Sequence, residues 1–189
     1  MKIGRLPMGY GNGSDPQVVV FTGLPGTGKT TLSELLSRAT GVPVFAADWL
    51  MGSLVPHGVL NDLEFEAYSA LHDGLMETLM VRQLRLGQSA ITDCVVDDAT
   101  AERWAGIAAE YGARLRVVEC VCSDTELHRS RVEGRVRGIP GWHEIDWAHV
   151  EHMRAELPPF TLDRLVTDAV NPIEDNLALV EAYVSGTPR

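Results

Sequence analysis

The sequence has no long hydrophobic run, few cysteines and comparatively little positive charge. No apolar stretch approaches the roughly 20 residues that a membrane-spanning helix needs. Residues 1–16 also contain no apolar core of the length found in secretory signal peptides. These absences exclude a membrane segment and lead us to expect a cytoplasmic protein.

The three cysteines, Cys94, Cys120 and Cys122, form neither a metal-binding nor a disulfide pattern. They lie in apolar, strand-like runs, without C-x-x-C spacing and without a histidine at the distance typical of zinc sites. Free cysteine is among the residue types most often buried. We therefore expect three buried, reduced thiols.

Acidic residues outnumber basic ones, with 26 Asp and Glu against 16 Lys and Arg, and the net charge is −10. A protein that grips long nucleic acid normally presents a basic face, so nucleic acid is not expected as a partner. The arginines are unevenly distributed, however, because Arg129, Arg131, Arg135 and Arg137 lie close together. Such a cluster in an acidic protein indicates a local site for an anion.

Residues 23–30, Gly-Leu-Pro-Gly-Thr-Gly-Lys-Thr, fit the phosphate-binding pattern G-x-x-x-x-G-K-[ST]. The apolar residues 18–21 before it suit a buried strand, and residues 31–39 after it suit a helix whose free N–H groups face phosphate. In this motif the lysine reaches the β- and γ-phosphates and the final hydroxyl ligates Mg²⁺. The residues expected to contact the nucleotide are Gly23, Pro25, Gly26, Thr27, Gly28, Lys29, Thr30 and Thr31.

Strands alternate with helices along the chain, which predicts an α/β fold with a parallel sheet and right-handed crossovers. The expected strands are 17–22, 42–47, 89–95, 114–121 and 163–168, and the expected helices are 31–40, 63–86, 98–111, 124–137, 146–156 and 172–184. Residues 49–60 are expected to form a loop because they contain glycine and proline. Residues 1–16 would be an irregular leader, and residues 17–189 a single domain with a lid at about 129–158.

Asp48 directly follows the second predicted strand. Ligands of open α/β sheets bind at the carboxyl ends of the strands, so polar residues there are the candidates for chemistry. A carboxylate at this position can take a proton from an attacking hydroxyl or help to hold Mg²⁺. Alternatively, Asp48 caps the segment that begins at Trp49.

Asp93 lies near the end of the third predicted strand, after the apolar residues 90–92. An aspartate at this place is the usual partner of a phosphate loop, where it holds Mg²⁺ directly or through water. Asp97 and Asp98 are weaker candidates, and Asp98 is expected to cap the following helix.

Arg131 and Arg135 are four residues apart and are expected to share one face of a helix. Guanidinium groups suit the phosphate oxygens on which charge develops during transfer, although a solvated surface helix would have the same pattern. Arg103, Arg137 and Trp142 are weaker candidates for contacts with an acceptor substrate. A surface role is the favoured alternative for Arg103, and Trp142 could equally pack the lid.

The phosphate loop, Asp48, Asp93 and the arginine helix, in this order, resemble the small P-loop kinases. This group includes chloramphenicol phosphotransferase, zeta toxin, gluconate kinase and the kinase domain of polynucleotide kinase, and the resemblance covers about residues 17–186. It implies a P-loop NTPase fold with a five-stranded parallel sheet in the order 2-3-1-4-5. It also implies ATP and Mg²⁺ as ligands, and transfer of the γ-phosphoryl group to a hydroxyl.

The resemblance also implies residue roles. In several of these kinases the aspartate after the second strand is the base, which matches Asp48, and the lid arginines match Arg131, Arg135 and Arg137. The turn after the last strand lies beside the adenine in relatives, which points to Pro172 here.

We therefore expect an ATP-dependent kinase that phosphorylates a hydroxyl of a small metabolite or antibiotic, with Lys29, Asp48 and Arg135 as catalytic residues. No residue identifies the acceptor, and nothing in the sequence indicates an oligomeric state.

Two alternatives stay open. A nucleic-acid 5′-end kinase is disfavoured by the acidic charge, and a nucleotide-binding regulatory ATPase without an acceptor would not need a base at Asp48. An AAA-type motor is disfavoured because no second phosphate loop, sensor-arginine module or arm for ring assembly is present.

Overall fold

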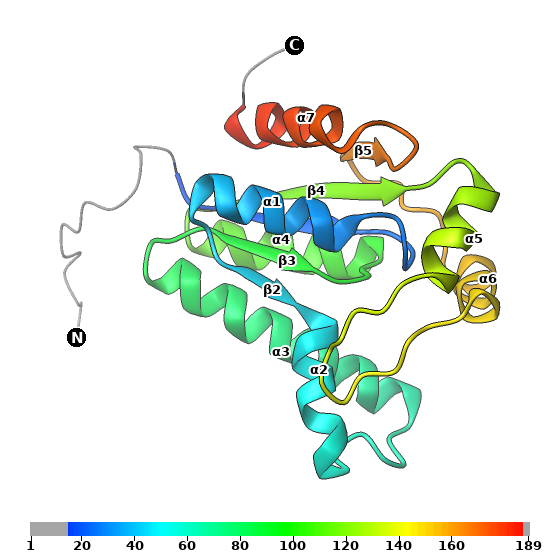
Figure 1. Ribbon diagram of the computed structural model, residues 1–189. Helices are drawn as coiled ribbons and strands as arrows, with labels where there is room; N and C mark the ends of the chain where they lie inside the picture. Colours follow the sequence, from blue (N-terminus) through cyan, green and yellow to red (C-terminus); the bar gives the residue numbers. More distant parts are fainter. Residues whose placement is uncertain (1–14, 187–189) are drawn as a thin grey trace.

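A computed structural model describes residues 15–186 (Figure 1), so the leader predicted for residues 1–16 lies almost entirely outside the described residues. At its centre is a parallel sheet of β1 (Gln17–Thr22), β2 (Val44–Ala46), β3 (Ala90–Asp93), β4 (Arg114–Val121) and β5 (Leu165–Asp168). The strand order is β2-β3-β1-β4-β5. The predicted fold class and sheet order are therefore confirmed.

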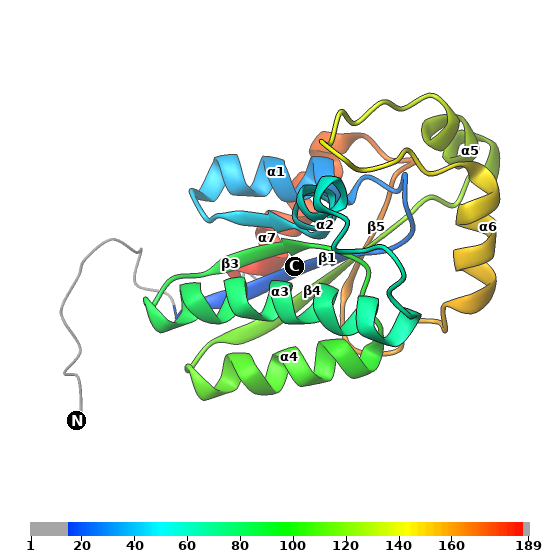
Figure 2. The ribbon, with the colours of Figure 1, turned by 90° about the horizontal axis from the view of Figure 1, so that it is seen from below.

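Helices cover both faces of the sheet (Figures 1 and 2). The first face carries α1 (Lys29–Thr40) and α7 (Ile173–Ser185), which pack together, and the second carries α3 (Phe65–Arg85) and α4 (Asp98–Glu110). The shorter helices lie near the carboxyl ends of the strands: α2 (Ala47–Leu54), η1 (Val55–His57), α5 (Thr125–Glu133) and α6 (Trp147–Glu156). This end of the sheet is where the phosphate loop also lies.

The strands bury apolar side chains on both faces, as parallel strands between two helical layers do. The core on the α3–α4 face includes Val18, Val20, Met76, Met80 and Trp104. The core on the α1–α7 face includes Val19, Phe21, Leu32, Leu36 and Val180. Because β1 contributes alternate residues to both clusters, it is fixed firmly in the middle of the sheet, and with it the start of the phosphate loop.

Residues 49–60, predicted to be a loop, begin with helix instead. Helix α2 starts directly after β2 and buries Ala47 and Met51. The prediction was wrong because Gly52 was interpreted as a helix breaker. In the structure the absence of a side chain at Gly52 lets a neighbouring segment pack closely against α2. A Cβ at this position would lie only 2.7 Å from the carbonyl oxygen of Pro140.

Helix α5 is shorter than the predicted 124–137. The Asp124 carboxylate caps it by accepting the N–H of Leu127 at 2.9 Å, but the helix ends at Glu133 with Gly134 as its C-cap. Glycine has a low helix propensity, which favours an end at this point. The prediction that Arg131 and Arg135 share a helix face is therefore wrong. Arg135 lies in the irregular connection of residues 134–146, which we call the α5–α6 loop.

Two smaller predictions were also wrong. Asp97, not Asp98, caps α4 by accepting the N–H of Thr100 at 2.8 Å. Asp98 instead accepts the N–H of Thr161 at 3.0 Å and so ties α4 to the segment before β5. Cys122 is partly exposed because β4 ends before it, whereas Cys94 and Cys120 are buried as expected.

All three cysteines are free. Within residues 15–186, no helix combines the length and the apolar character that crossing a membrane would require.

Trp104→Ala should lower the free energy of unfolding by about 3–5 kcal/mol. The Trp104 side chain is fully buried, and its Nε1 donates to Glu77 on α3 at 2.9 Å, so truncation leaves both a cavity and a lost hydrogen bond. Urea unfolding of the two proteins measures the difference. Phe65→Ala is the control: this side chain is 80% exposed, and its removal should change stability by less than about 0.5 kcal/mol. Equal losses in both variants would contradict the assignment of the core.

Candidate functional site

The phosphate loop joins β1 to α1, and its path depends on glycine at the first position. Gly23 has a φ of 124°, which few other residues adopt. A Cβ at Gly23 would overlap the carbonyl oxygen of Cys120 on the neighbouring strand β4. The loop can therefore leave the sheet only with glycine here, which is the physical reason for the first residue of the motif.

Lys29, one of two lysines in the sequence, begins α1 and folds back over the phosphate loop. Its Nζ donates to the carbonyl oxygens of Gly23 at 2.7 Å and Leu24 at 2.9 Å. Burial lowers the pKa of Lys29, and the negative charges of Asp93 and Asp48 act in the opposite direction. An anion bound in the loop would add to that compensation, so the geometry favours phosphate.

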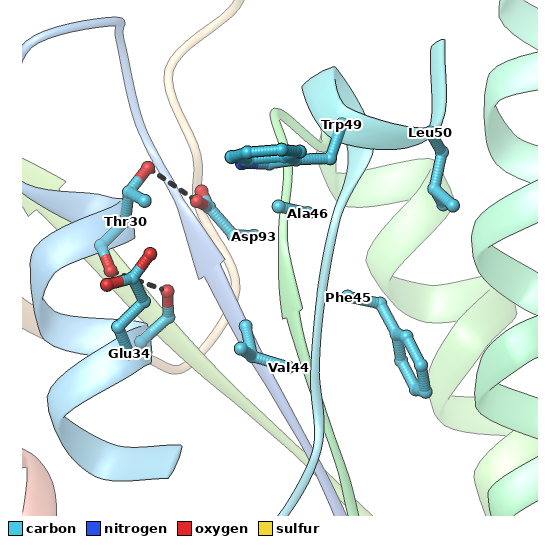
Figure 3. A pocket seen from close by; sticks show the side chains of 9 residues that line it. Thr30, Glu34, Val44, Phe45, Ala46, Trp49, Leu50 and Asp93 are labelled. Carbon is cyan, nitrogen blue, oxygen red and sulfur yellow. Dashed lines mark hydrogen bonds between the residues drawn. The ribbon is translucent and has the colours of Figure 1, made fainter. Parts of the chain in front are cut away.

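Thr30 and Asp93 lie together, and Thr30 Oγ1 donates to Asp93 Oδ2 at 2.6 Å (Figure 3). Burial raises the pKa of Asp93, and the nearby ammonium of Lys29 opposes this shift. Mg²⁺ prefers oxygen ligands and is usually bound through one or two carboxylates together with water and substrate phosphates. No group of three or more His, Cys, Asp or Glu residues in the described part of the chain is arranged to hold a metal. The Thr30–Asp93 pair therefore fits a magnesium ion that binds together with a nucleotide.

Asp48 lies in the first turn of α2 but does not cap it, since Ala46 is the N-cap and no side-chain cap bond is formed. Its carboxylate instead forms an ion pair with Arg137 Nη1 from the α5–α6 loop. Glu144, in the same loop, accepts hydrogen bonds from the Arg137 backbone N–H at 2.7 Å and from its Nε at 3.3 Å. The α5–α6 loop is thus fastened to the start of α2, and the helix-cap alternative for Asp48 is wrong.

Arg135 lies near this ion pair with part of its guanidinium unsatisfied. Its Nε and Nη2 are buried and have no hydrogen-bond partner among the described residues, and the Oε2 of Glu144 is 4.0 Å from Nε. Burial and the charge of Arg137 lower the pKa of Arg135, while Glu144, Asp48 and Asp93 oppose the shift. Buried N–H groups without a partner cost free energy, so this arrangement favours an anionic ligand.

Trp142 comes from the same loop and packs close to Gly52 on α2: its Cβ would lie 3.3 Å from a Cβ at that glycine. Its Nε1 is, after Nε and Nη2 of Arg135, a third buried N–H donor without a hydrogen-bond partner among the residues that the structure describes. Trp142 therefore joins the loop to α2 and also offers an N–H for which a ligand could be the acceptor.

Arg131 and Pro172 both lie at the β4–β5 side of the site. The charge of Arg131 acts on Cys122 and Asp168, which lie at the ends of β4 and β5. Pro172 is the N-cap of α7, a few residues beyond Asp168, and not a residue of its first turn. Arg131, predicted to contact phosphate, and Pro172, predicted to lie beside the adenine, thus come from neighbouring segments.

Arg103 is engaged elsewhere. It lies on α4 and pairs with Asp73 at 2.8 Å and Glu77 at 2.6 Å, both on α3. These two bonds join the helices of one face of the molecule. The structure therefore favours the surface alternative for Arg103 over a contact with substrate.

Sequence reasoning missed His128, which the structure places against the phosphate loop. Its Nε2 lies 2.7 Å from the carbonyl oxygen of Pro25, and its Nδ1 lies 3.2 Å from Arg154 Nη2 on α6. Pro25 and His128 are 103 positions apart in the sequence. No spacing could have identified the contact, because only the fold brings the two residues together.

Two cavities flank the phosphate loop. The smaller, of about 250 Å³, lies between α1, β2 and α2, and the Thr30–Asp93 pair lines one end of it. Figure 3 shows the ring of Trp49, which is half exposed, lying across this end of the cavity beside Asp93. The larger cavity, of about 330 Å³, is bounded by the phosphate loop, the end of β4 and residues 157–160. Trp49 is a further site residue that the sequence did not indicate.

A known protein family matches most of the chain. The AAA_33 family, described as an AAA domain, matches residues 18–160. The chain belongs to this family. The predicted resemblance to small P-loop kinases is confirmed by this family match together with a fold that solved structures of such kinases share.

Three solved kinase structures share the fold of this chain. A sugar kinase from Janibacter sp. HTCC2649 is 18% identical, with a TM-score of 0.66 over 92% of this chain and 96% of that chain. A gluconokinase from Sinorhizobium meliloti 1021 is 14% identical, with a TM-score of 0.67 over 90% and 93% of the two chains. APS kinase from Mycobacterium tuberculosis, in complex with AMPPNP and APS, is 17% identical, with a TM-score of 0.61 over 90% and 98%. At these identities the likeness shows the fold.

A curated relative is the cytidylate kinase from Methanobrevibacter smithii. It is 29% identical over 73 residues, which cover 39% of this chain and 42% of that enzyme. The chain thus matches less than half the length of this relative.

Gly23→Ala should lower the free energy of unfolding by about 1–3 kcal/mol more than Gly28→Ala. Both glycines have positive φ, 124° and 93°, so both substitutions carry backbone strain. A Cβ at Gly23 also overlaps the backbone of Cys120, whereas a Cβ at Gly28 meets no atom within 4 Å. Urea unfolding of both variants tests the difference. Equal destabilisation would show that close packing against β4 does not determine the loop's path.

Proposed function

We propose that this protein is a kinase that transfers the γ-phosphoryl group of ATP to a hydroxyl of a small molecule. The observation that carries the proposal is the convergence of unlike charges at the phosphate loop. Lys29 and Arg135 supply partly buried cations, and two donors of Arg135 have no hydrogen-bond partner among the described residues, while Asp93 and Asp48 supply carboxylates from two neighbouring strand ends. A protein that only binds nucleotide would not need a carboxylate at Asp48.

The nucleotide end of the site follows from the phosphate loop. The loop amides and the N-terminus of α1 bind the phosphates, and Lys29 turns from the carbonyls of Gly23 and Leu24 to the phosphate oxygens. Mg²⁺, held by Thr30 and Asp93, would neutralise charge on those oxygens. Arg131 is proposed to contact the phosphates, and Pro172 is proposed to lie beside the base.

At the acceptor end, Asp48 is proposed to take the proton of the attacking hydroxyl. Its ion pair with Arg137 orients the carboxylate, and Glu144 holds the arginine in place. The free N–H groups of Arg135 are proposed to donate to the transferring phosphoryl group as charge develops on its oxygens. Donors fixed before the reaction need no reorganisation during it, which is why such an arrangement lowers the barrier.

The acceptor is proposed to be a small molecule. The net charge of −10 opposes binding of a long polyanion. The cavity beside Thr30 and Asp93 measures about 250 Å³, which is near the lower end of the range for small-ligand pockets. The kinases named above, whose folds match this one, support the same class of reaction.

The decisive experiment measures ADP release from Mg-ATP with and without a panel of acceptors. The panel contains sugars, sugar acids, hydroxylated antibiotics, a 5′-hydroxyl oligonucleotide and cytidylate, and Lys29→Met serves as the blank. Release that depends on a small hydroxyl compound supports the proposal. Release that depends only on the oligonucleotide indicates an end kinase. Release that depends only on cytidylate indicates a phosphate acceptor, and release that no acceptor changes indicates a regulatory ATPase.

Asp48→Asn should bind Mg-ATP nearly as tightly as the parent but lose roughly 10²–10⁴-fold in kcat, because asparagine cannot take the proton. Asp93→Asn is the matched comparison, since it also removes one carboxylate charge, but from the proposed magnesium site and not from the proposed base. Its defect should diminish as the Mg²⁺ concentration rises. Steady-state kinetics over a Mg²⁺ titration separate the two. A parental rate in Asp48→Asn would remove its role as base, and rescue of that variant by Mg²⁺ would assign Asp48 to the metal.

Arg135→Ala should lower kcat by about 10³-fold or more while changing the affinity for Mg-ATP little, since an interaction made in the transition state appears in kcat. Arg129→Ala is the control, because Arg129 is exposed and pairs only with Glu133 of its own helix at 2.9 Å among the contacts described. The control should retain the parental kcat. Equal kcat values in the two variants would show that Arg135 does not contact the transferring group.

A further inference from the structure

His128 is buried on α5, directly behind the phosphate loop, with 1% of its surface exposed. Its ring and the side chain of Val132 pack on Gly26: a Cβ at that glycine would lie 2.6 Å from Val132 Cγ2 and 3.3 Å from His128 Cδ2. The imidazole Nε2 is 2.7 Å from the carbonyl oxygen of Pro25. Since a carbonyl only accepts, Nε2 must carry the proton in this hydrogen bond.

The other side of the ring is held by α6. Arg154 Nη2 lies 3.2 Å from His128 Nδ1, and a guanidinium can only donate, so Nδ1 must be unprotonated. Trp147 lies edge-on to the imidazole at 5.1 Å between ring centroids, and Arg154 stands over that indole at 5.3 Å. The two contacts of His128 are thus compatible only with a neutral imidazole that has its proton on Nε2.

The positive charges around His128 all lower its pKa. Burial lowers the pKa of His128, the hydrogen bond to Pro25 raises it, and Arg154, Lys29 and Arg131 lower it. Asp97 and Glu119 line the cavity on the same side of the loop. The imidazole therefore stays neutral at neutral pH, and its network is complete above the ordinary histidine pKa of roughly 6.5. It is lost as the pH falls through the lowered pKa, because protonation of Nδ1 sets an N–H against Arg154.

We propose that His128 is a positioning residue that holds the phosphate loop in its nucleotide-binding conformation, and that Arg154 selects the imidazole tautomer that makes this possible. The inference rests on the proposed function in that the loop binds nucleotide. It does not depend on which acceptor is phosphorylated. Arg154 on α6 acts on His128, and His128 acts on the carbonyl oxygen of Pro25 in the loop. Helix α6 thereby influences the affinity for nucleotide, although it is distant from the loop in sequence.

The test measures the Kd of Mg-AMPPNP by calorimetry from pH 5 to 8 in the parent, His128→Gln, His128→Phe and Arg154→Met. Glutamine can place an amide donor near the position of Nε2 and does not titrate, whereas phenylalanine keeps the ring volume without a donor. Arg129→Ala, on the exposed side of the same helix, is the control. The phosphates of the nucleotide themselves take up a proton in this range, so each variant is compared with the parent at the same pH.

At pH 8, His128→Phe should weaken binding about tenfold, the effect of one lost hydrogen bond, and His128→Gln should remain within about threefold of the parent. As the pH falls through the lowered pKa of His128, the parent should lose affinity relative to His128→Gln. In Arg154→Met this loss should begin at higher pH, because a cation that lowers the pKa of His128 is gone. A purely structural role would give variants that differ from the parent equally at every pH.

Nitrogen-15 NMR of the imidazole, recorded without nucleotide, should show a neutral ring protonated at Nε2. A ring protonated at Nδ1, a parental Kd in His128→Phe, or parallel pH profiles for the parent and His128→Gln would each overturn the inference. If the parent binds AMPPNP with the expected profile but phosphorylates no acceptor, the proposed function fails and this inference stands. If the parent does not bind AMPPNP at all, both fail.

Discussion

The site depends on the electrostatic interaction between Lys29 and Asp93. Both groups are buried at the end of the central strands, and burial opposes the charge of each: it lowers the pKa of the lysine and raises that of the aspartate. Each charge partly compensates the other, but the lysine still takes two loop carbonyls as partners and the aspartate takes the hydroxyl of Thr30. A magnesium–phosphate group would satisfy both more fully, so the cost of burying them favours binding of that ligand.

The α5–α6 loop brings the other charges to this pair. It can approach α2 because two glycines face each other there: a Cβ at Gly52 would crowd Pro140, and a Cβ at Gly141 would overlap the carbonyl oxygen of Gly52. The approach pairs Arg137 with Asp48 and leaves two buried donors of Arg135 without a hydrogen-bond partner in the described part of the chain. Close backbone packing in one place thus determines where the charges lie in another, which links the stability of this loop to the chemistry proposed for it.

The phosphate loop is supported from two sides. Towards the sheet, Gly23 lies so close to Cys120 that the loop's departure from β1 is fixed by sterics. Towards the helices, His128 and Val132 pack on Gly26, and the imidazole bonds to Pro25. The backbone amides of the loop are therefore held by rigid elements, as a site needs when binding depends on several donors meeting one ligand at the same time.

The sequence by itself determined the fold and the position of the phosphate loop in it. The motif of residues 23–30 and the alternation of strands with helices are local patterns, and the sheet order that the resemblance to small P-loop kinases implied is confirmed. The structure also brings Thr30 and Asp93 into contact. The end of α5, the helix after β2 and the contact of His128 with Pro25 escaped prediction. The last two depend on segments that approach one another only after folding, whereas α5 ends at a glycine, Gly134, whose low helix propensity is a local property. Local sequence spacing cannot show that Gly52 will pack against the carbonyl oxygen of Pro140, or that His128 will bond to that of Pro25. Only the tertiary structure brings these groups together.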